Sequence, residues 1–265
     1  MAAKAASSSA AIAAEKPGFS EKPGFAAAIA ALDDAAFQAM VQRLVAYRIL
    51  RHDPREGHYT AHPLIRSHYA ERLEAADRAQ VQAAHQRIKD YYLDLAGDTP
   101  ENPTLDDLAP LIEAVHHACR ADVYDEAHWI LQARIHQYSR RVLAWQLGAY
   151  ETSIALLLEF FAGGDTSQEP QVSDPRNRSW VLNEVGLCLM SLGRLGEAGP
   201  FYERKTAIQL DMEDWRNASI GYQNLAELHA HLGALDASAE AAREALALAR
   251  RAENKQEEVD SMAKK

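Results

Sequence analysis

The chain has 265 residues, of which 48% are hydrophobic and 25% are charged, a composition typical of a soluble folded protein. Its 28 basic and 38 acidic residues give a net charge of −10, which makes nucleic acid or an anionic membrane unlikely as the main partner. The sequence contains no stretch of the roughly 20 apolar residues that a membrane span requires, so no membrane association is expected.

Residues 1–32 form a low-complexity segment that we expect to be disordered. Its alanine- and serine-rich start lacks the apolar region of a secretory signal, which favours a cytoplasmic location. The sequence Glu-Lys-Pro-Gly-Phe then occurs twice, at 15–19 and 21–25, and each Pro-Gly pair breaks helix and strand. We interpret this tandem as a disordered linker, with a partner-binding peptide as the alternative.

Residues 33–75 are expected to hold two helices and one β-hairpin. The first helix begins after a capping Asp33 or Asp34 and has an apolar stripe of Phe37, Met40, Val41, Leu44 and Val45. The turn cluster at 53–57 then separates two short strand candidates. Pro63 suits the first turn of the second helix, which we expect to bury Leu64, Ile65, Tyr69 and Leu73.

From Ala76 onward the pattern predicts only helices. One has an apolar stripe at Val81, Ala84, Ile88, Tyr91 and Leu95, and it ends near Gly97 and Pro100. Thr104 and Asp107 form a capping pair for the next helix. The resulting division is divergent helical pairs at 76–162, a loop at 163–175, repeats at 176–253 and a charged tail at 254–265 that we expect to fray.

A recurring leucine-glycine motif, called the phrase below, lies in the turn between the two helices of a pair. Its glycines are Gly148, Gly193 and Gly233, so successive copies are offset by 45 (193 − 148) and then by 40 (233 − 193). Each glycine is followed five positions later by a small residue, namely Ser153, Ala198 and Ser238, and a weaker version of the phrase starts at Tyr124. The glycine allows a tight reversal, and the small residue allows the second helix to lie against the first.

The phrase resembles tetratricopeptide repeats, whose basic period is about 34 residues. The best copy places Tyr222, Leu225, Ala226, Gly233, Leu235, Ser238 and Ala245 on the signature positions of the family. The copy around Gly148 diverges, with Arg140 and Arg141 at positions that are usually leucine and glycine. The resemblance implies an all-α, right-handed helical solenoid, preceded by the partial winged-helix segment described next.

Residues 33–75 resemble the end of the winged-helix domain of the signal-transducing ATPases with numerous domains (STAND), the group that includes NB-ARC proteins. The run Leu-Val-Ala-Tyr-Arg-Ile-Leu at 44–50, the hairpin and His62-Pro63-Leu64-Ile65-Arg66 carry this likeness. The resemblance implies that His62 matches a histidine that contacts the phosphates of bound ADP. No phosphate-binding G-x-x-x-x-G-K-[ST] loop is present, so His62 would do this only beside an ATPase core supplied in cis or in trans. We therefore favour a structural role for His62 and predict no cofactor.

Neither a metal site nor an enzyme is expected. The eleven histidines lack ligand spacing and accompanying cysteine pairs, so we predict no metal ion. Ser191, Ser219 and Cys188 lie in helical packing patterns without a glycine-framed nucleophile turn. Cys188 and Cys119 are instead expected to be buried free thiols.

A binding role is favoured, because the first helix of each tetratricopeptide pair lines a concave groove for a protein or peptide ligand. The resemblance implies that the groove residues are Trp180, Asn183, Leu187 and Met190 in one repeat and Ile220, Gln223, Glu227 and His231 in the next. Asn183 and Gln223 would bond a peptide backbone, and Trp180 would provide apolar contact. The alternative is that some of these residues pack against a neighbouring repeat.

The sequence thus predicts a protein- or peptide-binding module, the sensor or scaffold part of a STAND-type ATPase. The alternative is a DNA-binding regulator, because Arg43, Arg48, Arg51, Arg55 and Arg66 cluster in the winged-helix segment. The acidic chain and the missing earlier helices of that domain argue against the alternative.

Overall fold

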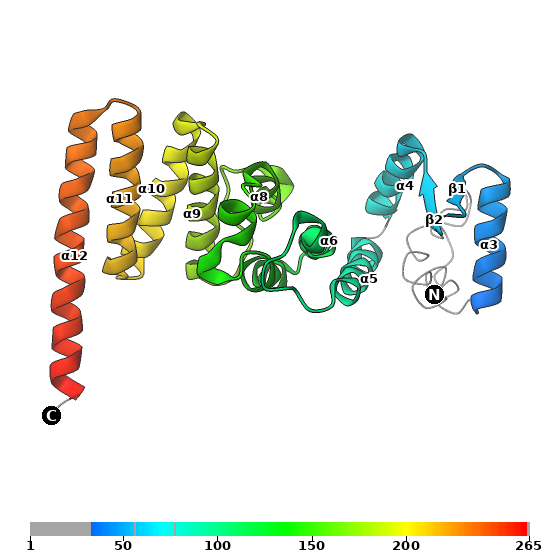
Figure 1. Cartoon of the computed structure of the whole chain (residues 1–265), viewed down its shortest axis with the longest axis horizontal. Helices are drawn as coiled ribbons and strands as arrows, with labels where there is room; N and C mark the ends of the chain where they lie inside the picture. The colour runs from blue at the N-terminus through cyan, green and yellow to red at the C-terminus, as the bar shows by residue number, and fades with distance from the viewer. Residues whose placement is uncertain (1–32, 56, 77, 264–265) are drawn as a thin grey trace. The chain divides into compact units, whose positions relative to one another are not determined.

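The computed structural model describes residues 33–55, 57–76 and 78–263. Helices make up most of the described chain, and its one sheet is a two-stranded antiparallel hairpin (Figure 1). The mostly helical class with one hairpin, predicted from the sequence, is confirmed. The predicted tail at 1–32 lies outside the described residues. None of the described helices is both long enough and apolar enough to cross a membrane.

The chain divides into two compact units. The first contains the described residues up to Asp98 together with residues 120–123, and the second contains the rest. This division differs from the sequence-based one, which separated residues 33–75 from the helix that follows. The physical reason is that helices on both sides of residue 77 pack on each other within the first unit.

The first unit begins with helix α3 (Asp34–Ala46), which Asp33 caps by accepting a 2.7 Å hydrogen bond from the Ala36 amide. Strands β1 (Leu50–Asp53) and β2 (His58–Ala61) then pair in antiparallel register, with Leu50 opposite Ala61. A small core forms where α3 meets the base of this hairpin. It contains Phe37, Val41 and Leu50, with Met40, Leu44, Val45 and Ala61 packed around them. The predicted apolar stripe of α3 is therefore confirmed.

Helices α4 (Pro63–Ala76) and α5 (Arg78–Ala96) complete the first unit and pack together. Pro63 begins α4 as predicted, but Leu64 is 74% exposed, so its predicted burial is wrong. Adjacent residues point about 100° apart on a helix, and here the half-buried line is the one through Ile65 and Tyr69.

The stripe predicted for α5 is only partly correct. Val81 and Ala84 are buried, but Leu95 is 43% exposed and Lys89 is buried instead. A lysine can occupy such a position because its aliphatic stem packs like an apolar side chain.

The second unit begins with α6 (Leu105–Arg120) and α7 (Tyr124–Trp129). The predicted cap of α6 is confirmed, since Asp107 N donates to Thr104 Oγ1 at 3.2 Å and Thr104 N donates to Asp107 Oδ2 at 2.8 Å. The buried face of α6 consists of Leu108, Leu111, Ala114, Val115, Ala118 and Cys119.

Irregular helices follow where the sequence predicted a regular pair. Two π-helices, η1 (Ile130–Ile135) and η3 (Val142–Gln146), flank the 3₁₀ turn η2 (Tyr138–Arg140). Gln137, Tyr138 and Arg141 have φ angles of 49°, 57° and 43°, which non-glycine residues rarely adopt. This segment coincides with the divergent copy that carries Arg140 and Arg141. It leads into α8 (Tyr150–Leu158), the 3₁₀ turn η4 (Ala162–Gly164) and an extended loop that ends at Asp174.

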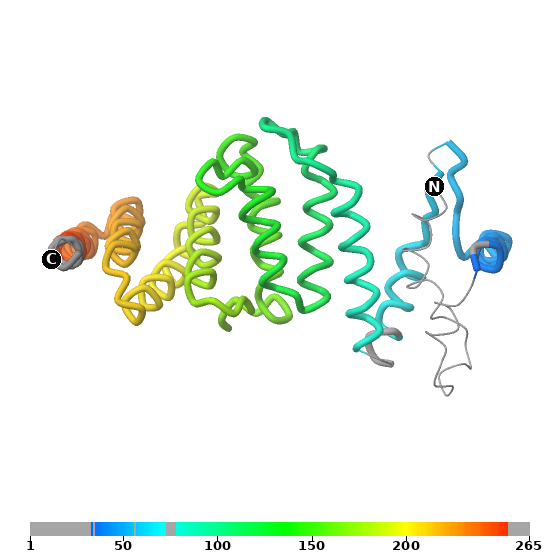
Figure 2. Tube along the Cα trace, turned by 90° about the horizontal axis from the view of Figure 1, so that it is seen from below, coloured from blue at the N-terminus to red at the C-terminus, as the bar shows by residue number. Residues whose placement is uncertain are grey.

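Four regular helices form the remainder, and each packs on the next: α9 (Pro175–Ser191), α10 (Leu195–Asp211), α11 (Trp215–His231) and α12 (Leu235–Ala263). They lie side by side in both views (Figures 1 and 2). Gly193 and Gly233 join them with φ angles of 73° and 74°, which confirms the predicted glycine turns. Ala198 is buried and Ser238 is half-buried, as the small-residue pattern predicted.

Helix α12 runs to Ala263, whereas the sequence suggested a frayed tail from residue 254. The backbone remains helical because residues 251–263 contain good helix formers such as alanine, glutamate and lysine and no glycine or proline. Both cysteines, Cys119 and Cys188, are free and buried, as expected.

Candidate functional site

The predicted binding residues form two matching stripes on α9 and α11. The first three positions of each stripe share the offset that separates Gly193 from Gly233, so that Trp180 matches Ile220 and Asn183 matches Gln223, whereas the fourth position of α11 lies one residue further on. Within each helix the residues are spaced by three or four positions, which places them on one face. We call these the α9 stripe (Trp180, Asn183, Leu187, Met190) and the α11 stripe (Ile220, Gln223, Glu227, His231).

The α11 stripe is open to solvent. All four of its residues are exposed, including the large apolar Ile220 at 41%. Their internal contacts are weak: Gln223 Nε2 donates to Ser219 Oγ at 3.4 Å, and His231 Nε2 lies 3.7 Å from Glu227 Oε1. Such contacts are easily exchanged for those of a ligand, because exposed pairs of this kind contribute little to stability.

The α9 stripe is half-buried and its side chains already contact neighbouring helices. The Trp180 ring meets His128 and His136 edge to face, with centroid separations of 4.9 Å and 5.5 Å. The Tyr202 hydroxyl donates to Met190 Sδ at 3.2 Å. Trp180 therefore packs against a neighbouring helical pair, which is the alternative considered above.

A polar network connects the α9 stripe to helix α11. Arg141 forms a bidentate ion pair with Glu184, which is only 1% exposed, through Nη2 to Oε1 and Nε to Oε2, both at 2.8 Å. Asn183 Nδ2 donates to Glu184 Oε1 at 3.1 Å, and Asn224 Nδ2 donates to Asn183 Oδ1 at 3.1 Å. Asn183 keeps one N–H and one oxygen lone pair for another partner, so the network orients its amide without using it up.

Two buried histidines, His128 and His136, pack against Trp180 of the α9 stripe. His128 is 3% exposed and His136 is 0% exposed, and in the described part of the chain neither ring nitrogen of His136 has a hydrogen-bond partner. Burial lowers the pKa of each imidazole to about 4, so both are neutral near pH 7. Neutral rings can serve as a packing surface for Trp180.

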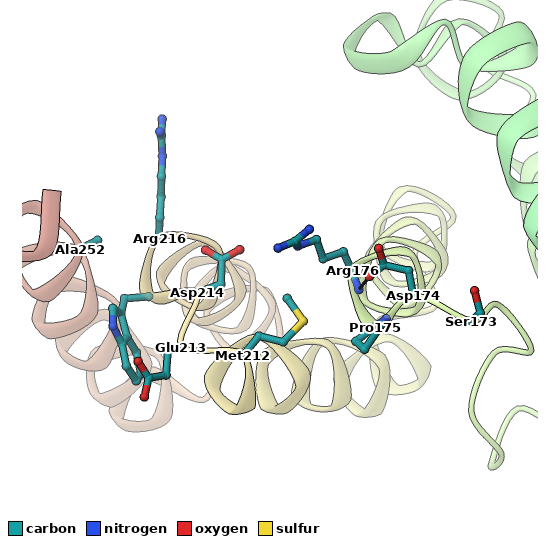
Figure 3. Close-up of a pocket in the computed structure, with 10 residues that line it drawn as sticks. Ser173, Asp174, Pro175, Arg176, Met212, Glu213, Asp214, Arg216 and Ala252 are labelled. Carbon is teal, nitrogen blue, oxygen red and sulfur yellow. Dashed lines mark hydrogen bonds between the residues drawn. The ribbon is translucent and has the colours of Figure 1, made fainter. Parts of the chain in front are cut away.

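A hollow of about 890 Å³ lies at the ends of the stripes, where α9 and α11 begin (Figure 3). Arg176 and Arg216 line it and extend the stripes, because each lies four residues before Trp180 or Ile220. In Figure 3 the Arg176 side chain points toward Asp214. The remaining lining residues are Ser173, Asp174, Pro175, Met212, Glu213, Trp215 and Ala252.

Sequence reasoning missed the hollow, the Arg141–Glu184 ion pair and the histidines beneath Trp180. A signal for the hollow was present, because Asp-x-Arg occurs at 174–176 and again at 214–216, with the same offset as the stripes. The ion pair and the histidine contacts carried no such signal, since their partners are far apart in sequence and do not repeat.

His62 lies outside these stripes, in the first unit. It is exposed, and its Nδ1 accepts a 3.2 Å hydrogen bond from the Leu64 amide at the start of α4. This contact supports the structural role that we favoured, while the phosphate-sensing role remains a prediction. The described residues contain no group of three or more histidine, cysteine or carboxylate side chains able to hold a metal ion.

Comparisons with known proteins found no matching protein-family model, no matching curated protein and no matching solved structure. We therefore infer the function from the geometry of the stripes and from the repeated pattern of the helices.

Proposed function

We propose that the chain is a protein- or peptide-binding helical repeat module and that the α9 and α11 stripes hold the ligand. The observation that carries this proposal is the exposed α11 stripe, which combines an apolar side chain with an amide and a glutamate–histidine pair on one helix face. Interfaces combine an apolar contact with polar groups that fix the register of the partner. The chain would have no catalytic role, and we propose a cytoplasmic location.

Regular helix pairs support the proposal. Helices α9, α10 and α11 each contain 17 residues, and left-handed residues occur in the following turns at Gly193, Glu213 and Gly233. These three turns are equally spaced along the chain. Each stretch between consecutive turns therefore holds one helix, and two such stretches hold a pair of helices. Such regularity is expected of a tetratricopeptide-like solenoid with long repeats, in which the first helix of each pair forms the binding surface.

We further propose that the module acts as the sensor or scaffold of a STAND-type ATPase whose core is supplied in cis or in trans. The helix, hairpin and helix of the first unit (α3, β1–β2 and α4) support this proposal, because they occur in the order expected for the end of a winged-helix domain. Ligand occupancy of the stripes would then be relayed to that core.

Selection of peptides on the intact chain tests the binding function. A phage-displayed library of random peptides would be panned on the full-length protein, and the selected peptides would be measured by fluorescence anisotropy. The variant Ile220→Ala/Gln223→Ala should weaken their binding at least about tenfold, which corresponds to about 1.4 kcal/mol. Both residues are exposed, so the variant should remain folded.

The matched control is Glu240→Ala/Arg243→Ala, which alters two exposed residues of α12 outside the stripes. The control should bind the selected peptides as the wild type does. Equal binding by both variants, or equal loss in both, would show that the α11 stripe is not the ligand-binding surface.

A further inference from the structure

The β1–β2 hairpin is exposed to solvent on both of its faces. Only its base is covered, where Leu50 is 5% exposed and Ala61 is half-buried against α3. All other residues of the two strands are exposed. A two-stranded hairpin by itself is marginally stable in water, so packing at its base holds this one in place while the rest is left for contact with a partner.

A local excess of positive charge surrounds this hairpin in an otherwise acidic chain. Residues 43–68 contain five arginines and two acidic residues, Asp53 and Glu56, which gives +3 (5 − 2) against −10 for the whole chain. Four histidines lie in the same stretch, at positions 52, 58, 62 and 68. The net charge of the chain therefore conceals a basic segment.

The five arginines are available to an anionic partner. Arg43, Arg48, Arg51, Arg55 and Arg66 are all exposed. Within the described ranges, none of their guanidinium groups forms an ion pair with a carboxylate. Guanidinium groups bind phosphate oxygens in a bidentate manner, and those without an internal partner lose no existing bond when they do so.

The two faces of the hairpin carry different side chains. Residues opposite each other in the register share a face, so Arg51 and Thr60 lie on one side. His52 and Tyr59 lie on the other side, where their rings stack with centroids 4.6 Å apart and an interplanar angle of 23°. One face thus carries Arg51 together with Asp53 and His58, and the other face carries a flat aromatic surface.

We propose that this hairpin binds in a groove of duplex nucleic acid, with Arg51 and Arg55 contacting backbone phosphates. The major groove of DNA is about 12 Å wide and admits a two-stranded ribbon. A ribbon in this groove lies between the two phosphate backbones, so guanidinium groups on its surface and at its turn can reach phosphate oxygens. The exposed arginines without a carboxylate partner complement the charge of these backbones. Duplex binding of this kind does not depend on the peptide-binding function of the second unit.

Binding of the full-length chain to a labelled duplex tests the proposal. The probe is a mixed-sequence DNA duplex of about two helical turns, titrated by fluorescence anisotropy in about 50 mM salt. The wild type should bind, and its affinity should fall about 12-fold between about 50 and 200 mM salt if Arg51 and Arg55 neutralise two phosphates. Arg51→Glu/Arg55→Glu should weaken binding at least about tenfold, and Arg51→Ala/Arg55→Ala should flatten the salt dependence.

The matched control is Arg243→Glu/Arg250→Glu, which changes the net charge by the same amount on exposed positions of α12. It should bind the duplex within about threefold of the wild type, since long-range charge effects are screened at this salt concentration. Absence of duplex binding, or an equal loss in both glutamate variants, would overturn the proposal. Equal or tighter binding to the single strand, to phosphatidylserine vesicles or to polyglutamate would also overturn it, because these probes offer no groove.

Discussion

At the scale of single residues, the two histidines beneath Trp180 make the stability of the second unit depend on pH. Burial lowers the pKa of His136 from 6.5 to about 4, with Glu184 opposing this change and Arg141 and His128 adding to it. Burial also lowers the pKa of His128 to about 4, and the charges of Asp125 and Asp174 oppose this change. Between pH 6.5 and 4 the unfolded state binds more protons than the folded state, so stability is fully present above pH 6.5 and is lost as the pH falls.

We predict that His136→Leu reduces this acid sensitivity. Each histidine with a lowered pKa should reduce the free energy of unfolding by about 2 kcal/mol as the pH falls from about 7.5 to about 5. The wild type should therefore lose about 4 kcal/mol and the variant about 2 kcal/mol. Urea unfolding at the two pH values measures the difference. The exposed residue His231 provides the control, and His231→Leu should keep the pH dependence of the wild type. An unchanged pH dependence in His136→Leu would contradict the assignment.

Which residue-level features could be predicted depended on the distance of the partner along the chain. The caps by Asp33 and by the Thr104–Asp107 pair were predicted, because they involve residues within one helical turn. The packing of Trp180 on His128 and His136 was left as one of two alternatives. Both partners lie far earlier in the chain, before α8 begins, and no repeated pattern indicates them.

At the scale of elements, turn chemistry explains why the sequence indicated only every second turn of the regular helices. Gly193 and Gly233 mark their turns because glycine favours a positive φ. The intervening turn between α10 and α11 has the same left-handed conformation at Glu213, with a φ of 53°, and a glutamate gives no such signal. The π-helical segment at 130–146 was missed for a similar reason, since Gln137, Tyr138 and Arg141 adopt positive φ without glycine.

We predict that Glu213→Gly stabilises the second unit. A left-handed conformation costs a non-glycine residue about 1–2 kcal/mol, whereas glycine loses more chain entropy on folding, so a net gain of up to about 1 kcal/mol is expected. Glu213 is exposed, and loss of its surface contacts should remove little of this gain. The urea midpoint should therefore rise.

The reciprocal variant Gly233→Ala serves as the control for this turn. Its Cβ would meet no atom within 4 Å, so any effect comes from the φ of 74° alone. It should destabilise the protein by about 1 kcal/mol. A lower urea midpoint for Glu213→Gly, together with an unchanged one for Gly233→Ala, would show that backbone strain does not determine the stability of these turns.

At the scale of the whole molecule, the two units carry the two proposed functions separately. The stripes on α9 and α11 lie in the second unit, and the basic hairpin lies in the first. Sequence patterns located both segments but placed the boundary after residue 75, because the packing of α4 on α5 is a tertiary contact that periodicity does not reveal. The net charge of −10 likewise gave no indication of how charge is distributed between the units.

We predict that a fragment of residues 99–265 folds cooperatively and keeps the peptide-binding function without the duplex-binding one. The fragment retains the buried residues from Leu108 to Leu248. It loses the hydrogen bonds that Asp122 accepts from Arg78 Nη2 at 2.5 Å and from Gln82 Nε2 at 2.7 Å. These bonds are exposed, so their loss should cost less than about 1 kcal/mol.

Circular dichroism during urea unfolding should show one transition for this fragment. Peptides selected on the full-length chain should bind it with unchanged affinity, because both stripes are intact. The labelled duplex should no longer bind, because the fragment lacks the hairpin and all five of its surrounding arginines. Duplex binding by the fragment would place the nucleic-acid surface on the second unit. Loss of peptide binding by a folded fragment would show instead that the first unit contributes to the peptide site.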